Sequence, residues 1–175
     1  AHLREGRLTP ASILLTHGHM DHVAGLAEVA RAFPKAPVGL HPEDARWAFT
    51  SANSMPPYYE TPEAPAQIER AWAGGQTWTD DELTYEIIEV PGHSPGSVAF
   101  YFRALDLVFS GDVLFAGSIG RTDLPGGHAA TLGHSLRRLL ELPDETVVYP
   151  GHGPDTTIGA ERAGNPFLRN LPPNR

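Results

Sequence analysis

Short apolar runs alternate with stretches of helical periodicity along most of this chain. The apolar runs are rich in β-branched and aromatic residues and are bounded by turn-forming residues, as is typical of strands. They cover 12–15, 37–40, 83–90, 97–102, 105–109 and 146–149. Helical spacing predicts helices over 23–33 and 131–142, and 66–73 is a candidate for a third, while the proline-rich stretch 54–65 indicates a loop. Strands that alternate with helices predict an α/β sandwich.

Four of these predicted strands end beside a histidine or an aspartate. The residues are His17, His93, Asp112 and His152, and the last three each follow a glycine. In α/β proteins, ligands bind beyond the carboxyl ends of strands, and a neighbouring glycine lets the backbone approach a ligand closely. We therefore expect four loops to converge on one rim of the sheet.

The first of these loops, "THGHMDH", holds an unusual density of potential metal ligands. His17 and His19 are two positions apart, so in extended backbone both imidazoles project to the same side and can share one metal ion. Asp21 and His22 stand at the expected start of the following helix, where they can hold a second ion. Without a metal, so many neighbouring polar groups would be costly to bury.

Composition limits the possible partners, metal ligands and cellular location. The chain has 175 residues, which suits a single domain over 1–175, and its formal net charge of −8 argues against nucleic acid or a membrane surface as a partner. It has no cysteine, so metal ligands must be nitrogen or oxygen atoms. Neither a signal peptide nor a long apolar run occurs, and we expect a cytoplasmic protein.

Other candidate motifs are weaker. The stretch "GHSPG" matches the pattern of a serine nucleophile elbow, but Pro95 lacks the backbone N–H that would serve the oxyanion hole, which makes Ser94 a poor nucleophile. No H-E-x-x-H motif or Walker-type loop occurs. The remaining histidines are expected to be ordinary surface or core residues: His2, His41, His128 and His134.

The motifs "THGHMDH", "GHSPGS", "FSGDVLF" and "YPGHGP" resemble, in order, the metal-binding motifs of the metallo-β-lactamase fold. The resemblance covers nearly the whole chain and implies an αββα sandwich. It also implies two groups of ligands and one bridging residue. These are His17, His19 and His93 for the first metal, Asp21, His22 and His152 for the second, and Asp112 between them.

Within this superfamily, "GSIGRTDLPGG" and "TTIGAERAGNPFL" are similar to the small single-domain hydrolases related to glyoxalase II, or hydroxyacylglutathione hydrolase. That similarity implies cleavage of a small, anionic thioester by a hydroxide held between two divalent ions, with zinc favoured and iron or manganese as alternatives. Asp21 would orient the hydroxide as well as bind metal, and Arg121 is a candidate contact for a substrate carboxylate. An ion pair between Arg121 and Asp123 is the competing expectation.

The chain departs from this pattern at both ends. Members of the fold open with several strands ahead of the first histidine motif, and we expect those N-terminal strands to be missing here. Glyoxalase II itself carries an additional C-terminal helical domain that helps to hold glutathione, whereas this chain stops soon after "NPFL". Recognition of glutathione is therefore left open, as is the oligomeric state.

Two alternative functions stay open beside the thioester hydrolase. A persulfide dioxygenase has the same fold and a similar "GRTD" text, but it uses one iron, and its family follows the last histidine with Asp-Tyr where this chain has Gly153 and Pro154. A metal-binding remnant without turnover is the second alternative. A flavo-diiron electron carrier is disfavoured because it would place glutamate at the position of His19.

Overall fold

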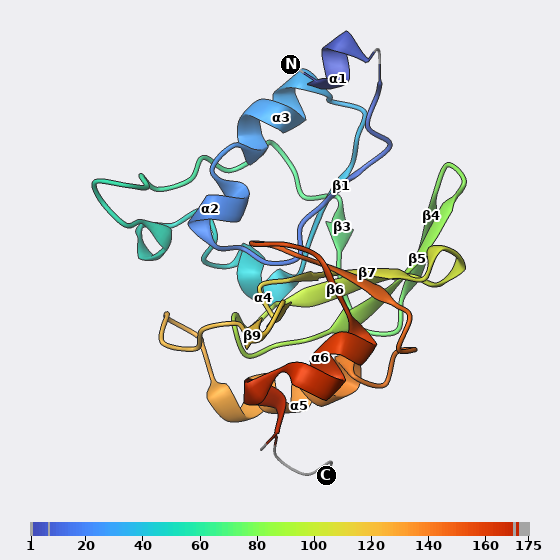
Figure 1. Cartoon of the computed structure of the whole chain (residues 1–175). Coiled ribbons are helices and arrows are strands. Elements are labelled where there is room, and N and C mark those ends of the chain that lie inside the picture. The colour runs from blue at the N-terminus through green and yellow to red at the C-terminus, as the bar shows by residue number, and fades with distance from the viewer. Residues whose placement is uncertain (1, 7, 170, 172–175) are drawn as a thin grey trace.

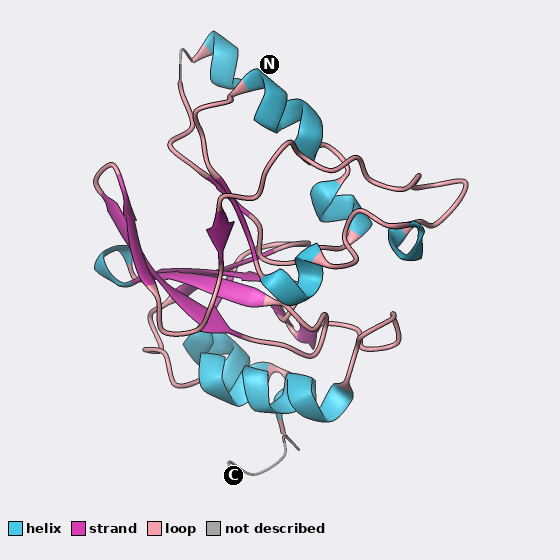
Figure 2. Cartoon of the chain, turned by 180° about the vertical axis from the view of Figure 1, so that it is seen from behind, coloured by secondary structure: helices cyan, strands magenta, loops and turns pink. Residues whose placement is uncertain are grey.

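Two β-sheets lie face to face, and helices cover the outer side of each sheet (Figures 1 and 2). The computed structural model describes residues 2–6, 8–169 and 171. The arrangement is an αββα sandwich, which confirms the predicted fold class. None of the helices in these residues combines the length and the apolar character needed to cross a membrane.

The smaller sheet has three parallel strands in the order β1-β2-β3. They are β1 (Ile13–Leu14), β2 (Val38–Leu40) and β3 (Arg70–Ala71). Four short helices precede or follow these strands: α1 (His2–Glu5), α2 (Met20–Val23), α3 (Leu26–Ala32) and α4 (Pro42–Ala45). A core of Leu15, Val23, Leu26, Val38 and Leu40 excludes water between the sheet and helices α2 and α3.

The larger sheet has six strands in the order β11-β10-β7-β6-β5-β4. They are β4 (Thr77–Asp80), β5 (Leu83–Glu89), β6 (Val98–Phe102), β7 (Leu107–Gly111), β10 (Val147–Pro150) and β11 (Thr156–Thr157). Among the described strands of this sheet, only β7 and β10 pair in parallel, and a small hairpin of β8 (Leu114–Phe115) and β9 (Ser118–Ile119) follows β7. The outer face is covered by α5 (Ala129–Leu139) and α6 (Ile158–Gly164). Three single turns of 3₁₀ helix complete the fold: η1 (Ser51–Asn53), η2 (Arg103–Leu105) and η3 (Pro166–Leu168).

Strand β6 is buried on both faces, and its side chains alternate between two cores. Val98, Phe100 and Phe102 point toward the smaller sheet and form a core between the sheets with Trp72 and Tyr85. Ala99 and Tyr101 point the other way and join the core beneath α5 and α6. This explains why β6 is apolar at every position. In a strand with one face exposed to solvent, apolar and polar residues alternate.

One predicted helix is wrong. The stretch 66–73 contains no helix: Arg70–Ala71 form β3, the rest is irregular, and Trp72 packs between the sheets. Its indole N–H donates to the carbonyl of Leu15 at 3.2 Å, and its ring fills the space above Gly39, where a Cβ atom would lie 1.7 Å from the ring. Tertiary packing thus overrides the local helical pattern. The stretch 54–65 is a loop, as predicted, with one isolated bridge between Met55 and Tyr59.

Asp80 ties the two sheets together at the end of β4. Its carboxylate accepts two hydrogen bonds of 2.7 Å from Arg70 in β3, one of 2.6 Å from Ser12 beside β1, and one of 2.8 Å from Tyr85 in β5. The bonds from Arg70 lower the pKa of Asp80 to about 2, with smaller contributions from Ser12 and Tyr85. The ionised form of Asp80 therefore stabilises the contact between the sheets.

We expect Asp80→Asn to lower the free energy of unfolding at neutral pH by about 2–3 kcal/mol, because charge-assisted hydrogen bonds to a mostly buried carboxylate are lost. A carboxylate with a lowered folded-state pKa contributes stability above its unfolded pKa of about 4, and this contribution fades as the pH falls toward about 2. The difference between wild type and variant, measured by urea denaturation, should shrink over that interval.

Glu63→Gln is the matched control for Asp80→Asn. It removes one partner of the exposed ion pair with Arg31, so the urea midpoint should hardly move. Equal effects of the two substitutions would contradict a special role for Asp80.

Candidate metal centre

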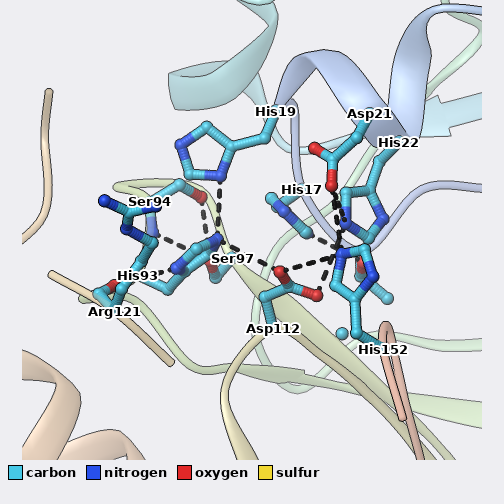
Figure 3. A network of polar contacts seen from close by, with 12 residues as sticks. His17, His19, Asp21, His22, His93, Ser94, Ser97, Asp112, Arg121 and His152 are labelled. Atoms are coloured by element: carbon cyan, nitrogen blue, oxygen red, sulfur yellow. Dashed lines mark hydrogen bonds and ion pairs between the residues drawn. The ribbon is translucent and has the colours of Figure 1, made fainter. Parts of the chain in front are cut away.

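Seven histidine and aspartate side chains meet at one edge of the sandwich, where strands of both sheets end (Figure 3). The loop after β1 supplies His17 and His19, and α2 supplies Asp21 and His22. The loops after β5, β7 and β10 supply the remaining three: His93, Asp112 and His152. The structure therefore brings together every residue that the sequence singled out as a metal ligand.

The three-histidine half of the centre consists of His17, His19 and His93. All three side chains are buried, with between 1% and 4% of their surface exposed. His19 Nδ1 and His93 Nε2 are 2.8 Å apart, and the ring of His17 lies 5.0 Å from that of His19 and 4.9 Å from that of His93. Their ligand atoms lie within 4.8 Å of one another, so one ion could contact all three.

The acidic half consists of Asp21, His22 and His152 and is more open to solvent. His152 Nε2 is 3.0 Å from Asp21 Oδ2, and His22 Nε2 is 3.5 Å from the same oxygen. Asp112 lies between the halves: its Oδ1 is 3.4 Å from His22 Nε2, and its Oδ2 is 3.7 Å from His93 Nε2 and 3.5 Å from His152 Nε2. One carboxylate therefore reaches both groups.

Neighbouring groups determine which ring nitrogens face the centre. His93 Nδ1 donates to the backbone carbonyl of Arg121 at 2.9 Å, because a carbonyl can only accept. A neutral His93 then presents the lone pair of Nε2 to the centre. His17 Nδ1 lies 3.1 Å from the hydroxyl of Thr16, which leaves His17 Nε2 directed inward.

Burial and charge give the two halves different protonation behaviour. Burial, reinforced by the neighbouring histidines, holds the pKa of His17 well below its ordinary value, and burial together with His93 lowers the pKa of His19 to about 4. Burial also opposes charge on His22, but Asp112 and Asp21 outweigh it and raise the pKa of His22. His17 and His19 are therefore neutral at pH 7, as metal ligands must be.

The residues present fit a metal centre. Among the described residues, three buried atoms that face this centre lack a hydrogen-bond partner: His17 Nε2, His22 Nε2 and Asp112 Oδ1. Buried polar atoms are normally satisfied, so a cluster of unsatisfied atoms indicates a binding site for a ligand. Imidazole nitrogens with carboxylate oxygens are a donor set that suits zinc, iron or manganese.

Four other residues that the sequence singled out lie outside the centre. The guanidinium of Arg121 forms an exposed, bidentate ion pair with Asp123 at 2.7 Å, and only the Arg121 carbonyl contacts a site residue. Ser94 is fully buried, and its hydroxyl donates to Asp44 at 2.6 Å, which agrees with its dismissal as a nucleophile. His41 and His128 each accept a backbone N–H at a helix start, as ordinary capping residues do.

No sequence motif marks the residues that support the ligands. Asp44 and Asn53 are buried and bond the backbone around Gly18, between His17 and His19. The sequence "LHPEDARWA" gives little sign of this supporting role. Asp44 lies in the first turn of α4, where acidic residues are common because they interact favourably with the helix dipole. Its burial could be found only from the structure.

The αββα sandwich with histidine and aspartate side chains clustered at the strand ends is the architecture of the metallo-hydrolase fold. The chain belongs to the metallo-beta-lactamase superfamily, whose family profile matches residues 1–152. It is 43% identical over 174 residues to the "Probable metallo-hydrolase YqgX" of Bacillus subtilis, and the match covers 97% of this chain and 81% of that protein. It is 38% identical to the "Hydroxyacylglutathione hydrolase GloC" of Haemophilus influenzae, over 90% of this chain and 76% of that protein.

Solved structures share both fold and sequence with this chain. The crystal structure of "BLEG-1 B3 metallo-beta-lactamase" has a TM-score of 0.89 and 41% identity, covering 97% of this chain and 82% of that one. "TTHA1623 in a di-iron-bound form" has a TM-score of 0.82 and 43% identity over 95% and 82% of the two chains. "ETHE1 from Myxococcus xanthus" has a TM-score of 0.75 and 29% identity over 94% and 65%.

If the unsatisfied nitrogen of His17 serves a metal, then His17→Leu should stabilise the metal-free protein. We expect its free energy of unfolding to rise by about 1 kcal/mol in the presence of a chelator, because a buried polar atom without a partner is removed. The same variant should lose metal from the three-histidine half, as measured by inductively coupled plasma mass spectrometry.

Asn165→Leu is the control for this substitution. Asn165 is also buried, but its amide bonds Ser118, Glu161 and Phe167, so its replacement should destabilise the protein. If His17→Leu destabilises the metal-free protein as much as Asn165→Leu does, His17 is an ordinary buried residue.

Proposed function

We propose that this protein hydrolyses a small thioester with two divalent metal ions, held by His17, His19 and His93 in one half and by Asp21, His22 and His152 in the other. The observation that carries the proposal is the position of Asp112, whose two oxygens approach His22, His93 and His152. A carboxylate that reaches both ligand groups suits a pair of ions better than one ion.

Zinc is the ion we favour, with iron or manganese as alternatives, and the di-iron form of TTHA1623 supports iron. When bound, two such ions would lower the pKa of a water molecule toward about 7 and polarise the carbonyl of the substrate. The two aspartates would leave the centre with a net positive charge, which attracts an anionic substrate.

Asp21 would act on the attacking water. Its carboxylate is partly exposed and lies beside His152 at the open side of the centre, so it can accept a hydrogen bond from water and orient it toward the substrate carbonyl. A thiolate leaves without needing a proton, because thiols ionise at a pKa of about 8.5. The chain therefore needs no protein nucleophile and no dedicated general acid for a thioester.

The likeness to GloC, whose name specifies a hydroxyacylglutathione hydrolase, supports this choice of substrate. The likeness to ETHE1 keeps the one-iron dioxygenase as the second candidate, together with the "GRTD" text at residues 120–123. The BLEG-1 structure adds β-lactams to the substrates that a test must include.

Metal content and thioester turnover, measured on the same gently purified sample, test the proposal. About two zinc, iron or manganese ions per chain and hydrolysis of an S-2-hydroxyacylglutathione are expected. One iron per chain with oxygen consumption on a persulfide would establish the dioxygenase, and hydrolysis of a β-lactam alone would establish a lactamase. Bound metal without turnover of any of these substrates would indicate a non-catalytic protein.

Asp21→Asn should lower kcat for the thioester by about 10²- to 10⁴-fold, the range expected when a side chain that holds the attacking water by a hydrogen bond is lost. Its unfolding midpoint should change little, because Asp21 is partly exposed. Glu28→Gln, an exposed substitution in α3, controls for the change in net charge and should retain full activity. Near-normal hydrolysis by Asp21→Asn would remove this role.

A further inference from the structure

Asp44 in α4 is a fully buried carboxylate that links two ligand loops. Its Oδ2 accepts a 2.8 Å hydrogen bond from the backbone N–H of Gly18 and a 2.6 Å bond from the Ser94 hydroxyl. Its Oδ1 accepts a 2.7 Å bond from the backbone N–H of Gly96. One side chain thus joins the loop of His17 and His19 to the loop of His93.

The glycines at both positions allow this contact. A Cβ atom on Gly96 would lie 2.8 Å from Asp44 Cγ and Oδ1, and one on Gly18 would lie 3.1 Å from Asp44 Cβ and 3.0 Å from Ala48 Cβ. Any larger residue would push the loop away from the carboxylate, because backbone and core atoms have little room to move. The sequence "HGH" therefore places a glycine between two histidines where Asp44 needs one.

A second buried side chain, that of Asn53, holds the carbonyl group of Gly18. Asn53 donates one hydrogen bond of 2.8 Å to the Gly18 carbonyl and another of 2.7 Å to the Ala48 carbonyl. With the N–H of Gly18 held by Asp44, both backbone groups between the two histidines are anchored. The imidazoles of His17 and His19 then have fixed starting directions.

The third ligand is held through the residues that follow it. Ser94 comes directly after His93, and its hydroxyl lies 2.8 Å from that of Ser97, which also accepts the Ser94 N–H at 3.1 Å. Asp44 closes this tight turn by accepting from Ser94 and Gly96. The direction in which His93 leaves the backbone therefore depends on the same carboxylate.

We propose that Asp44 is a positioning residue that sets the mutual placement of His17, His19 and His93 and thereby the metal affinity of the three-histidine half. The inference rests on the ligand assignment proposed above. The hydrogen bonds of the Asp44 carboxylate go to Gly18, Ser94 and Gly96, next to the three histidines, whereas Asp21 and His22 lie further along, on α2, and His152 follows β10. Loss of Asp44 should therefore affect the two halves unequally.

Asp44→Asn tests this role because it keeps the size of the side chain but replaces one acceptor oxygen with an amide that faces an N–H or O–H donor. Zinc binding to the chelator-treated protein is measured by competition with a chromophoric chelator, and His93→Ala identifies the binding step that belongs to the three-histidine half. We expect Asp44→Asn to weaken that step by about 10- to 100-fold, as is usual when a partner of the ligand shell is lost, with little effect on the other step.

Glu161→Gln is the matched control. Glu161 is also a buried carboxylate with three hydrogen bonds, from Gly117 at 2.9 Å and from Thr156 and Asn165 at 2.7 Å, and none of these partners is a candidate ligand. Both substitutions should lower the unfolding midpoint of the metal-free protein, but only Asp44→Asn should weaken zinc binding. Equal zinc affinities of the two variants would overturn the inference.

Two further results complete the test. If Asp44→Asn does not fold, Ser94→Ala decides, since it removes one bond to Asp44 and leaves the two backbone bonds in place. A smaller loss of affinity at the same step supports the role, and an unchanged affinity overturns it. If the wild-type protein binds no zinc, iron or manganese, the proposed metal centre itself is wrong. If the wild-type protein binds metal and Asp44→Asn binds it equally well, only the role of Asp44 is wrong.

Discussion

The close packing of the two sheets is the constraint on which everything else depends. Trp72, Tyr85 and Phe100 fill the space between them, and the indole of Trp72 passes over β2 to the carbonyl of Leu15, which follows β1 in the same sheet. A bond between the two sheets runs from the Val98 N–H to the Thr16 carbonyl. Because these contacts leave the sheets only one way to fit together, the carboxyl ends of β1, β5, β7 and β10 come to a common edge.

The centre at that edge is a place where function opposes stability. Imidazole nitrogens that face one another inside a protein cannot all find donors, and their burial lowers the pKa of His17 and His19 instead of satisfying them. The surrounding structure compensates through fully satisfied carboxylates such as Asp44 and Asp80. These hold the backbone in a geometry that the site residues alone would not maintain.

The sequence predicted those parts of the molecule that depend on local periodicity and on the residue types directly after a strand. The αββα layers, the helix at 129–139 and the meeting of His17, His93, Asp112 and His152 all agree with such patterns. The non-helical course of 66–73 could not be predicted, because it depends on Trp72 and its hydrogen-bond partner 57 positions away. Asp44 escaped notice for the same reason: its donors lie 26, 50 and 52 positions along the chain.

The chain also divides neatly in space. Strands β1 to β3 and helices α1 to α4 precede Gly74, whereas β4 to β11 and helices α5 and α6 come after Gly75, so the backbone passes once from one half of the sandwich to the other. Four of the seven clustered side chains come from the first half and three from the second. A pair of ions at that seam would act as a reversible cross-link, comparable in topology to a disulfide. If the chain were cut between Gly74 and Gly75, metal binding would then favour reassociation of the two fragments.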